Sequence, residues 1–184
     1  DILYIVYKYG INDKFSDEVI KELDNIPNEV SESEKQGRRD LRDKVIFTID
    51  GDDTKDIDDA VSIEKKGDNY ILGVHIADVS YYVKEGTELY KEAYDRSTSV
   101  YLVDRVIPML PHKLSNGICS LNPNVDRLAI SCVMEINPNG KVVNHDIFES
   151  VIRSRKQMTY NNVNKILKNE EIPEGYEEFS EDLK

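Results

Sequence analysis

The feature that most constrains the fold of this chain is a cluster of acids placed directly after a short apolar run. Six aspartates occupy ten consecutive residues, from Asp50 to Asp59. They follow residues 45–49, whose β-branched and aromatic side chains are typical of a short buried strand. The acids therefore begin at the end of a strand, in a loop too short to hold them far apart.

Carboxylates crowded in this way indicate a cation site. Two carboxylates about 4 Å apart repel by roughly 1 kcal/mol in water and by several times that near a protein surface. The cluster therefore persists only if some acids are protonated or a divalent cation lies among them. Ligation by oxygen alone suits Mg²⁺, Mn²⁺ or Ca²⁺ better than zinc. A calcium-sensing EF-hand is excluded, because a loop starting at Asp50 has Lys55 and Val61 where that loop needs Gly and Glu.

A phosphatase is an alternative interpretation of the same segment. An apolar strand followed by Asp50-Gly-Asp52 resembles the first motif of the haloacid-dehalogenase-like phosphatases, in which the first aspartate is the phosphoryl nucleophile. The second aspartate of that motif is a general acid. This short pattern leaves Asp56, Asp58 and Asp59 without a role, and the sequence lacks the later helices of a doubly wound α/β fold.

The charge distribution allows a polyanionic partner despite the acidic total. The 184 residues, enough for one domain, have a net charge of −12. Residues 44–167 carry 15 basic and 18 acidic groups, and they become net positive once the six clustered aspartates are set aside. No apolar run approaches the roughly 20 residues of a membrane span. Cys119 and Cys132 form no C-x-x-C pair and are expected to be reduced, which predicts a cytoplasmic protein.

The pattern of apolar and turn-forming residues predicts an α+β fold, with a mixed, hairpin-rich sheet and flanking helices. Two hairpins are predicted, over 60–76 and 127–152, and each has a turn segment at its centre. Residues 101–103 are expected to be extended, and residues 108–111 and 115–117 are expected to be irregular. Ser16 and Thr87 are predicted helix N-caps, so helices are expected to begin at residues 17 and 88, and a third near residue 159.

Charge also divides the chain into three parts. Residues 1–43 are predicted to be a helical lead-in followed by a charged, solvated connector, which contains Arg38, Arg39 and Arg42. Residues 44–168 form the main folded part. Residues 169–184, with many acids and no apolar period, are predicted to be a poorly ordered end.

The residues from Thr48 to Val61 resemble the acidic signature of the RNB catalytic domain, which is found in the exoribonucleases ribonuclease II and ribonuclease R. Further blocks resemble the same domain in the same order: Val74–Ser80, Tyr101–Leu102, Ile107–Pro111, Leu114–Pro123, Val125–Leu128 and Ile152–Tyr160. The lead-in Gly37–Asp43 is more similar to ribonuclease R than to ribonuclease II. The resemblance thus extends over most of the chain.

This resemblance implies a processive, hydrolytic 3′→5′ exoribonuclease that degrades single-stranded RNA to nucleoside 5′-monophosphates with Mg²⁺, or with Mn²⁺ in its place. Four acids match the family's catalytic and metal-binding positions. By analogy Asp50, Asp56 and Asp59 hold metal, with two ions in the complete site, while Asp58 helps to ligate metal and orients the 3′-terminal nucleotide. Tyr101 matches a tyrosine that stacks on a base.

The resemblance also implies that much of the family's architecture lies outside this chain. The family's catalytic domain continues well beyond Lys184, and its second half supplies an arginine and an acid to the active site. Cold-shock domains precede the catalytic domain in the family, and an S1 domain follows it. Residues 44–168 therefore match the amino-terminal part of an RNB domain, and the fragment alone is expected to be inactive. A non-catalytic RNA-binding descendant is a further alternative.

Other polar residues are expected to have structural roles. His75 lies in a strand of alternating character without a nearby ligand partner, which favours a hydrogen-bonded core histidine. Asp78 is expected to cap a turn, and Asp52 and Asp53 are expected to be exposed loop acids. Arg127 is explained equally well as part of an RNA path and as a solvated strand charge.

Overall fold

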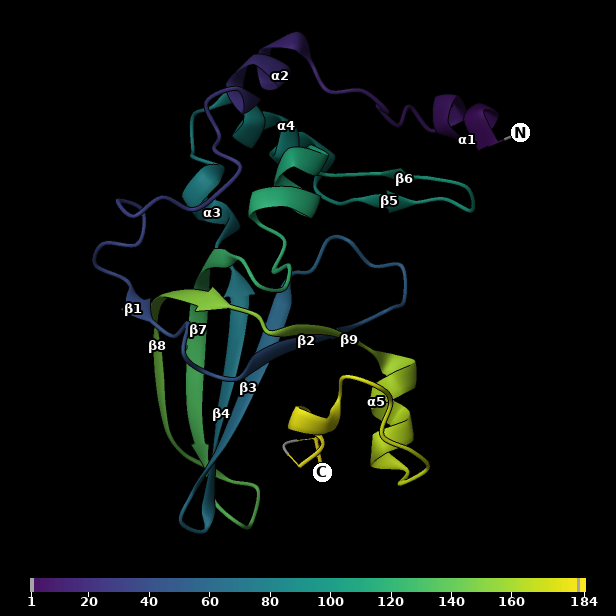
Figure 1. Cartoon of the computed structure of the whole chain (residues 1–184). Coiled ribbons are helices and arrows are strands. Elements are labelled where there is room, and N and C mark those ends of the chain that lie inside the picture. Colours follow the sequence, from purple (N-terminus) through teal and green to yellow (C-terminus); the bar gives the residue numbers. More distant parts are fainter. Residues whose placement is uncertain (1, 182) are drawn as a thin grey trace.

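Two antiparallel hairpins form the centre of the computed structural model, which describes residues 2–181, 183 and 184 (Figure 1). The first joins β3 (Asp59–Lys66) to β4 (Asn69–Ala77), and Gly67 takes a left-handed conformation with φ of +61° in the turn between them. The second joins β7 (Asp126–Ile136) to β8 (Val142–Arg153). Both predicted hairpins are confirmed.

The hairpins belong to a mixed sheet of seven strands in the order β1-β8-β7-β4-β3-β2-β9. Strand β4 pairs with β7 and so joins the two hairpins. On one side β2 (Ile46–Asp50) pairs antiparallel with β3 and parallel with β9 (Lys156–Thr159). On the other side β1 (Arg39–Asp40) pairs parallel with β8. The α+β class with a mixed, hairpin-rich sheet is therefore confirmed.

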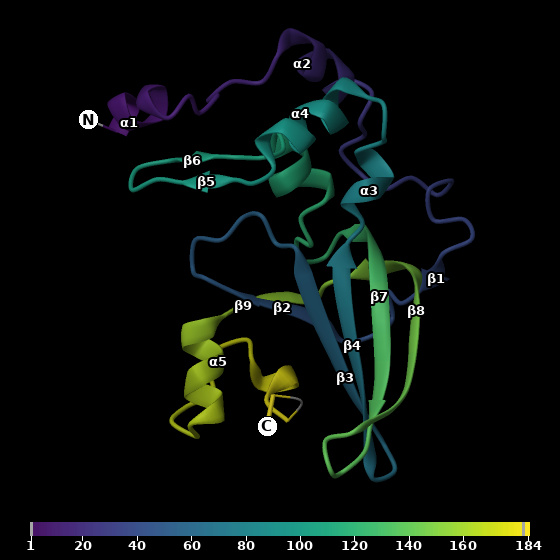
Figure 2. The same ribbon diagram turned by 180° about the vertical axis from the view of Figure 1, so that it is seen from behind.

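Most helices lie at the end of the sheet where β4 ends and β7 begins (Figures 1 and 2). The predicted caps are present: Ser16 accepts a hydrogen bond from Val19 N, and Thr87 accepts one from Tyr90 N. The helical elements are α1 (Ile2–Lys8), α2 (Asp17–Leu23), α3 (Val79–Tyr82), α4 (Glu88–Arg96), the π-helical turn η1 (Lys113–Ile118), α5 (Tyr160–Leu167) and the 3₁₀ turn η2 (Glu177–Phe179). No helix among the described residues has the length and apolar character needed to cross a bilayer.

A short arm projects from this helical end. It consists of β5 (Val100–Tyr101) and β6 (Val106–Ile107), which pair with each other and not with the main sheet (Figure 2). The extended conformation predicted at Tyr101 is confirmed. Residues 115–117 are less irregular than predicted, because they lie within η1.

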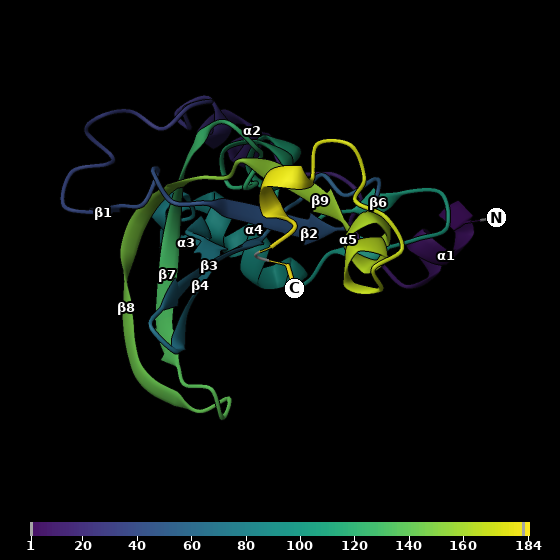
Figure 3. The same cartoon turned by 60° about the horizontal axis from the view of Figure 1, so that its bottom comes forward.

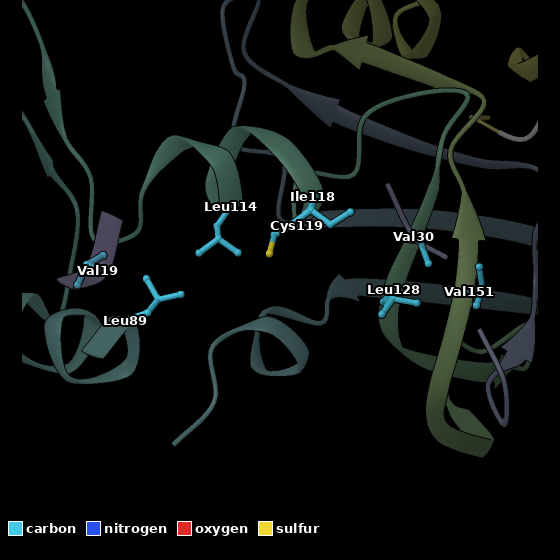
Figure 4. Close-up of a cluster of buried hydrophobic side chains, with 8 residues drawn as sticks. All are labelled: Val19, Val30, Leu89, Leu114, Ile118, Cys119, Leu128 and Val151. Carbon is cyan, nitrogen blue, oxygen red and sulfur yellow. The ribbon is translucent and has the colours of Figure 1, made fainter. Parts of the chain in front are cut away.

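Three clusters of buried side chains hold these parts together. The first joins α2, α4 and η1 to the adjoining ends of β7 and β8, and Figure 4 shows its members, which include Leu89, Leu114 and Ile118. The second lies on one face of the sheet and contains Ile57 and Leu121. The third packs α5 and the C-terminal segment beside β2 and β9, on the side away from β8 (Figure 3).

The connector before β2 is only partly solvated, because some of its basic side chains are buried although most of its residues are exposed. The Arg38 guanidinium forms an ion pair of 2.6 Å with Asp78, and both side chains are only 4% exposed. Arg42 bonds to Asp126, which also pairs with Lys35. Charges counted along the chain do not reveal that these basic groups meet acids from later parts of the sequence.

The acidic C-terminal segment also differs from its prediction. Tyr176 and Phe179 are each 4% exposed. The Phe179 ring packs edge-on against Phe47 of β2, with the ring centroids 5.7 Å apart. Two aromatic side chains thus anchor a segment whose composition suggested poor order, and their burial outweighs its low overall hydrophobicity.

Candidate active site

The sheet brings the two ends of the acidic cluster together. Asp50 is the last residue of β2, and Asp59 is the first residue of the adjacent antiparallel strand β3. Residues 51–58 connect them in a loop beside the helical end of the sheet (Figure 1). Asp50 and Asp56 are half-buried, whereas Asp58 and Asp59 are exposed. The strand-end position predicted for the acids is confirmed.

The acidic loop is anchored at its middle by Ile57. The Ile57 side chain is fully buried, and its backbone N–H donates a hydrogen bond of 3.1 Å to Ser120 Oγ. The same hydroxyl donates to the carbonyl of Lys55 at 2.7 Å. Leu121 N donates to the Ile57 carbonyl at 2.9 Å. Asp56 and Asp58 flank this anchor and are therefore held at fixed points of the chain.

The acids act on one another electrostatically. Burial is the largest cause of the raised pKa of Asp50. The nearby Thr48 hydroxyl lowers that pKa, and the negative charges of Asp59 and Asp56 raise it. Asp58 is exposed, but the surrounding protein still removes part of its hydration, and this desolvation is the largest cause of its raised pKa. The negative charges of Asp56, Asp59 and Asp50 raise that pKa further. A bound cation would reverse the repulsive part of both shifts.

One carboxylate oxygen in this cluster has no partner. Asp50 Oδ2 is among the few buried side-chain atoms of the described residues that lack a hydrogen bond, and Thr48 Oγ1, on the same strand, is another. An unpaired buried oxygen is costly unless an ion or water satisfies it. The donor set is entirely oxygen, as Mg²⁺ requires. Across residues 2–181, 183 and 184, however, no three acid, histidine or cysteine side chains already converge on one point. The donor chemistry thus fits a cation.

Tyr101 reaches the acidic loop from the projecting arm. Its hydroxyl donates a hydrogen bond of 3.0 Å to Asp56 Oδ2, and this bond is the main reason that the pKa of Tyr101 is raised. The residue is 66% exposed. It lines a cleft of 570 Å³ with Asp56, Lys55, His112 and Asn116, among other residues. The hydroxyl is thus engaged with a candidate ligand residue, while the residue itself stays accessible.

The two other acids of the cluster are exposed, as predicted. Asp52 accepts a hydrogen bond of 3.1 Å from the side chain of Asn161, at the start of α5. Asp53 lines the same cleft as Tyr101.

Two residues behind the loop were missed from the sequence. Ser120 is 1% exposed. It lies in the block Leu114–Pro123 that resembles the family, but the sequence predicts no role for it. Arg127 is neither a solvated charge nor part of an exposed path, because it is 7% exposed. Its guanidinium donates to the carbonyls of Ser120 and Gly117 at 2.7 and 3.1 Å. Nothing in the local pattern indicates these contacts, because they depend on the turn at residues 123–125, between Ser120 and Arg127.

The remaining structural predictions have mixed outcomes. His75 is a buried, hydrogen-bonded core histidine, as predicted, and it contacts Ser62 and Ser131. Asp78 does occupy the N-cap position of α3, but its side chain makes no cap hydrogen bond. The carboxylate binds Arg38 instead.

Comparison with known proteins identifies the family. A model of the RNB domain matches residues 38–184. This chain belongs to the RNB domain family. The match begins at Arg38, the connector residue that is buried against the sheet of this RNB domain. A mixed sheet with two central hairpins is not a doubly wound α/β fold, so the haloacid-dehalogenase alternative is wrong.

Relatives and solved structures support the same assignment. Ribonuclease R of Thermotoga maritima is 52% identical over 98% of this chain and 26% of its own length. The structure of Mycoplasma genitalium RNase R in complex with ribose-methylated single-stranded RNA matches 94% of this chain and 27% of its own, with a TM-score of 0.87 and 32% identity. Yeast Ssd1, described as a pseudonuclease, shares the fold with a TM-score of 0.70 and 20% identity over 79% of this chain and 18% of its own. The RNB chain described here thus spans about a quarter of the curated relatives that it matches.

Proposed function

We propose that this chain is the acid-bearing part of a processive, metal-dependent 3′→5′ exoribonuclease that hydrolyses RNA to nucleoside 5′-monophosphates. The observation that carries the proposal is the anchored acidic loop, in which Asp50 keeps a buried carboxylate oxygen without a partner among mutually repelling acids. Membership of the RNB family and 52% identity to a ribonuclease R support it. The fold alone would not support the proposal, because yeast Ssd1, described as a pseudonuclease, has the same fold.

The acids have separate roles in this proposal. Asp50, Asp56 and Asp59 would hold Mg²⁺, or Mn²⁺ in its place, with two ions in the complete site. When bound, such ions activate water and neutralise the charge on the leaving oxygen of a phosphodiester. Asp58 helps to ligate metal and orients the 3′-terminal nucleotide. Asp58 is exposed at the end of the anchored loop, and Asp56, two residues before it, lines the adjacent cleft.

Tyr101 supplies a stacking surface for single-stranded RNA. Stacking of a base on an aromatic ring contributes about 1–3 kcal/mol and is indifferent to sequence. The residue is well exposed, and its hydroxyl bond to Asp56 ties the stacking site to the acidic loop. A degradative enzyme that must accept every base is served by this kind of contact.

The 184 residues alone should have little activity. Positioning of a phosphodiester needs groups on both sides of the scissile bond, and the candidate acids all come from one loop and its flanking strands. The chain covers 26% of its Thermotoga relative. We propose that residues 44–168 are the amino-terminal part of the catalytic domain, with cold-shock and S1 domains elsewhere in the complete protein. The free thiols of Cys119 and Cys132 support a reducing, cytoplasmic location.

The decisive test replaces one acid in the complete gene product. Asp58→Asn should abolish release of mononucleotides from single-stranded RNA while it leaves RNA binding, measured by fluorescence anisotropy, nearly unchanged. Asp52→Asn is the matched control, because Asp52 is an exposed acid of the same loop without an assigned role. Near-normal turnover by Asp58→Asn would remove Asp58 from the mechanism. RNA binding without any turnover by the wild-type protein would identify a non-catalytic descendant.

A further inference from the structure

The acidic loop is supported from behind by one serine hydroxyl. Ser120 Oγ accepts the Ile57 N–H at 3.1 Å and donates to the Lys55 carbonyl at 2.7 Å. A hydroxyl has one proton and two acceptor sites, so a single side chain can satisfy both backbone groups at once. The residues bonded in this way lie directly before and after Asp56, and Asp58 follows Ile57.

Arg127 in turn supports the segment that carries the serine. Its Nε donates to the Ser120 carbonyl at 2.7 Å, and its two terminal nitrogens donate to the carbonyls of Gly117 and Asp126 at 3.1 and 2.9 Å. A rigid, planar guanidinium that binds three carbonyls fixes their relative positions. The turn at residues 117–120 is therefore tied to the start of β7.

We infer that Ser120, supported by Arg127, is a positioning residue that sets Asp56 and Asp58 relative to Asp50. The inference rests on the proposed function, since it concerns the geometry of that same site. Asp50 is held by strand β2, which pairs on both sides. The loop before Asp58 has no such ladder, and the bonds to Ser120 and Leu121 take its place there. The Asp58 carbonyl accepts a further bond of 2.9 Å from Ala77 N, at the end of β4. Loss of the hydroxyl leaves a buried N–H without its acceptor and frees the loop to move.

The test compares two buried serines. Ser120→Ala removes the support, whereas Ser131→Ala removes an equally buried hydroxyl that bonds to His75 and Ser150 on β4 and β8. In the complete gene product, Mn²⁺ affinity is measured by electron paramagnetic resonance, and kcat and KM are measured on single-stranded RNA. Hydrogen exchange of the Ile57 amide is measured in the 184-residue chain. Thermal unfolding of both variants shows how much stability each has lost.

Ser120→Ala should weaken Mn²⁺ binding roughly 10–100-fold, the usual effect of losing a residue that orients metal ligands. It should lower kcat with little change in KM, and it should speed exchange at Ile57. Ser131→Ala should change none of these three readouts beyond its effect on unfolding. If Ser120→Ala does not fold, Ser120→Cys, which is similar in shape but a weak hydrogen-bonding group, provides the same comparison.

The outcomes separate the two proposals. Equal Mn²⁺ affinity and equal kcat for the Ser120 and Ser131 variants, with an active wild type, would overturn the positioning role and leave the nuclease function intact. A wild-type protein that neither binds Mn²⁺ nor releases nucleotides would overturn the proposed function, and the positioning role with it.

Discussion

Lowering the pH from 7 to 4.5 should destabilise this fold through one buried imidazole. His75 lies at the centre of the sheet and is 1% exposed. Its Nδ1 is 2.7 Å from Ser131 Oγ and its Nε2 is 3.1 Å from Ser62 Oγ, so both ring nitrogens already have neutral partners. Burial lowers the pKa of His75 from 6.5 to about 4.

The sign and size of the effect follow from proton linkage. Above pH 6.5 the imidazole is neutral in both states and contributes no pH dependence. Between pH 6.5 and about 4 the unfolded chain binds a proton that the folded chain does not, so the free energy of unfolding falls as the pH falls. Each pH unit in that interval costs about 1.36 kcal/mol, so the loss at pH 4.5 is roughly 2.5 kcal/mol.

The assay is urea unfolding followed by circular dichroism at pH 7 and pH 4.5. The carboxylates also titrate in this range, so the useful quantity is the wild-type loss minus the loss in His75→Gln. That difference should be roughly 2.5 kcal/mol. His145→Gln, on an exposed part of β8, keeps the buried imidazole and should show the full wild-type loss. Equal losses in the wild type and His75→Gln would refute the reasoning.

Three further predictions concern packing and ion pairs. A methyl group at Gly73 would lie 2.8 Å from the Nε2 atom of the buried imidazole, so Gly73→Ala should lower the urea midpoint by an amount that corresponds to about 1–3 kcal/mol. Asp78→Asn leaves the buried Arg38 guanidinium without its carboxylate, so it should lower the free energy of unfolding by about 3–5 kcal/mol. Arg39→Gln removes a half-exposed ion pair and should lower the same quantity by less than about 1 kcal/mol in the same assay. Phe179→Ala should cost about 3–5 kcal/mol, and a melting temperature close to that of the wild type would show that the C-terminal segment does not pack on β2.

The sequence predicted the parts of this fold that depend on neighbouring residues. Alternating apolar residues around turn segments identified both hairpins, and Ser16 and Thr87 marked helix starts through their own capping bonds. The strand-end position of the acids followed in the same way, because the apolar run immediately precedes Asp50.

Contacts between distant residues could not be predicted. Arg38 meets Asp78 only after the connector docks on the sheet, and Ile57 bonds to Ser120, which lies 63 residues later in the chain. The buried state of Phe179 was hidden because seven acids dominate the composition of residues 169–184. The acids themselves were identified by their spacing, whereas the residues that hold them in place carry no comparable local pattern.

The two parallel pairings of the sheet determine when strands β1 and β2 can be completed during synthesis. Strand β2 pairs with the nearby strand β3, but its other edge pairs with β9, which is synthesised about 100 residues later. In that pairing Phe47 lies opposite Lys156 and Asp50 lies opposite Thr159. Strand β1 likewise pairs with a strand that is made later, β8, in which Ser150 lies opposite Arg39. A chain emerging from the ribosome folds from its N-terminus, and contacts of high sequence separation form slowly. The strand that carries Asp50 therefore keeps one edge unpaired until residues near 159 have been synthesised.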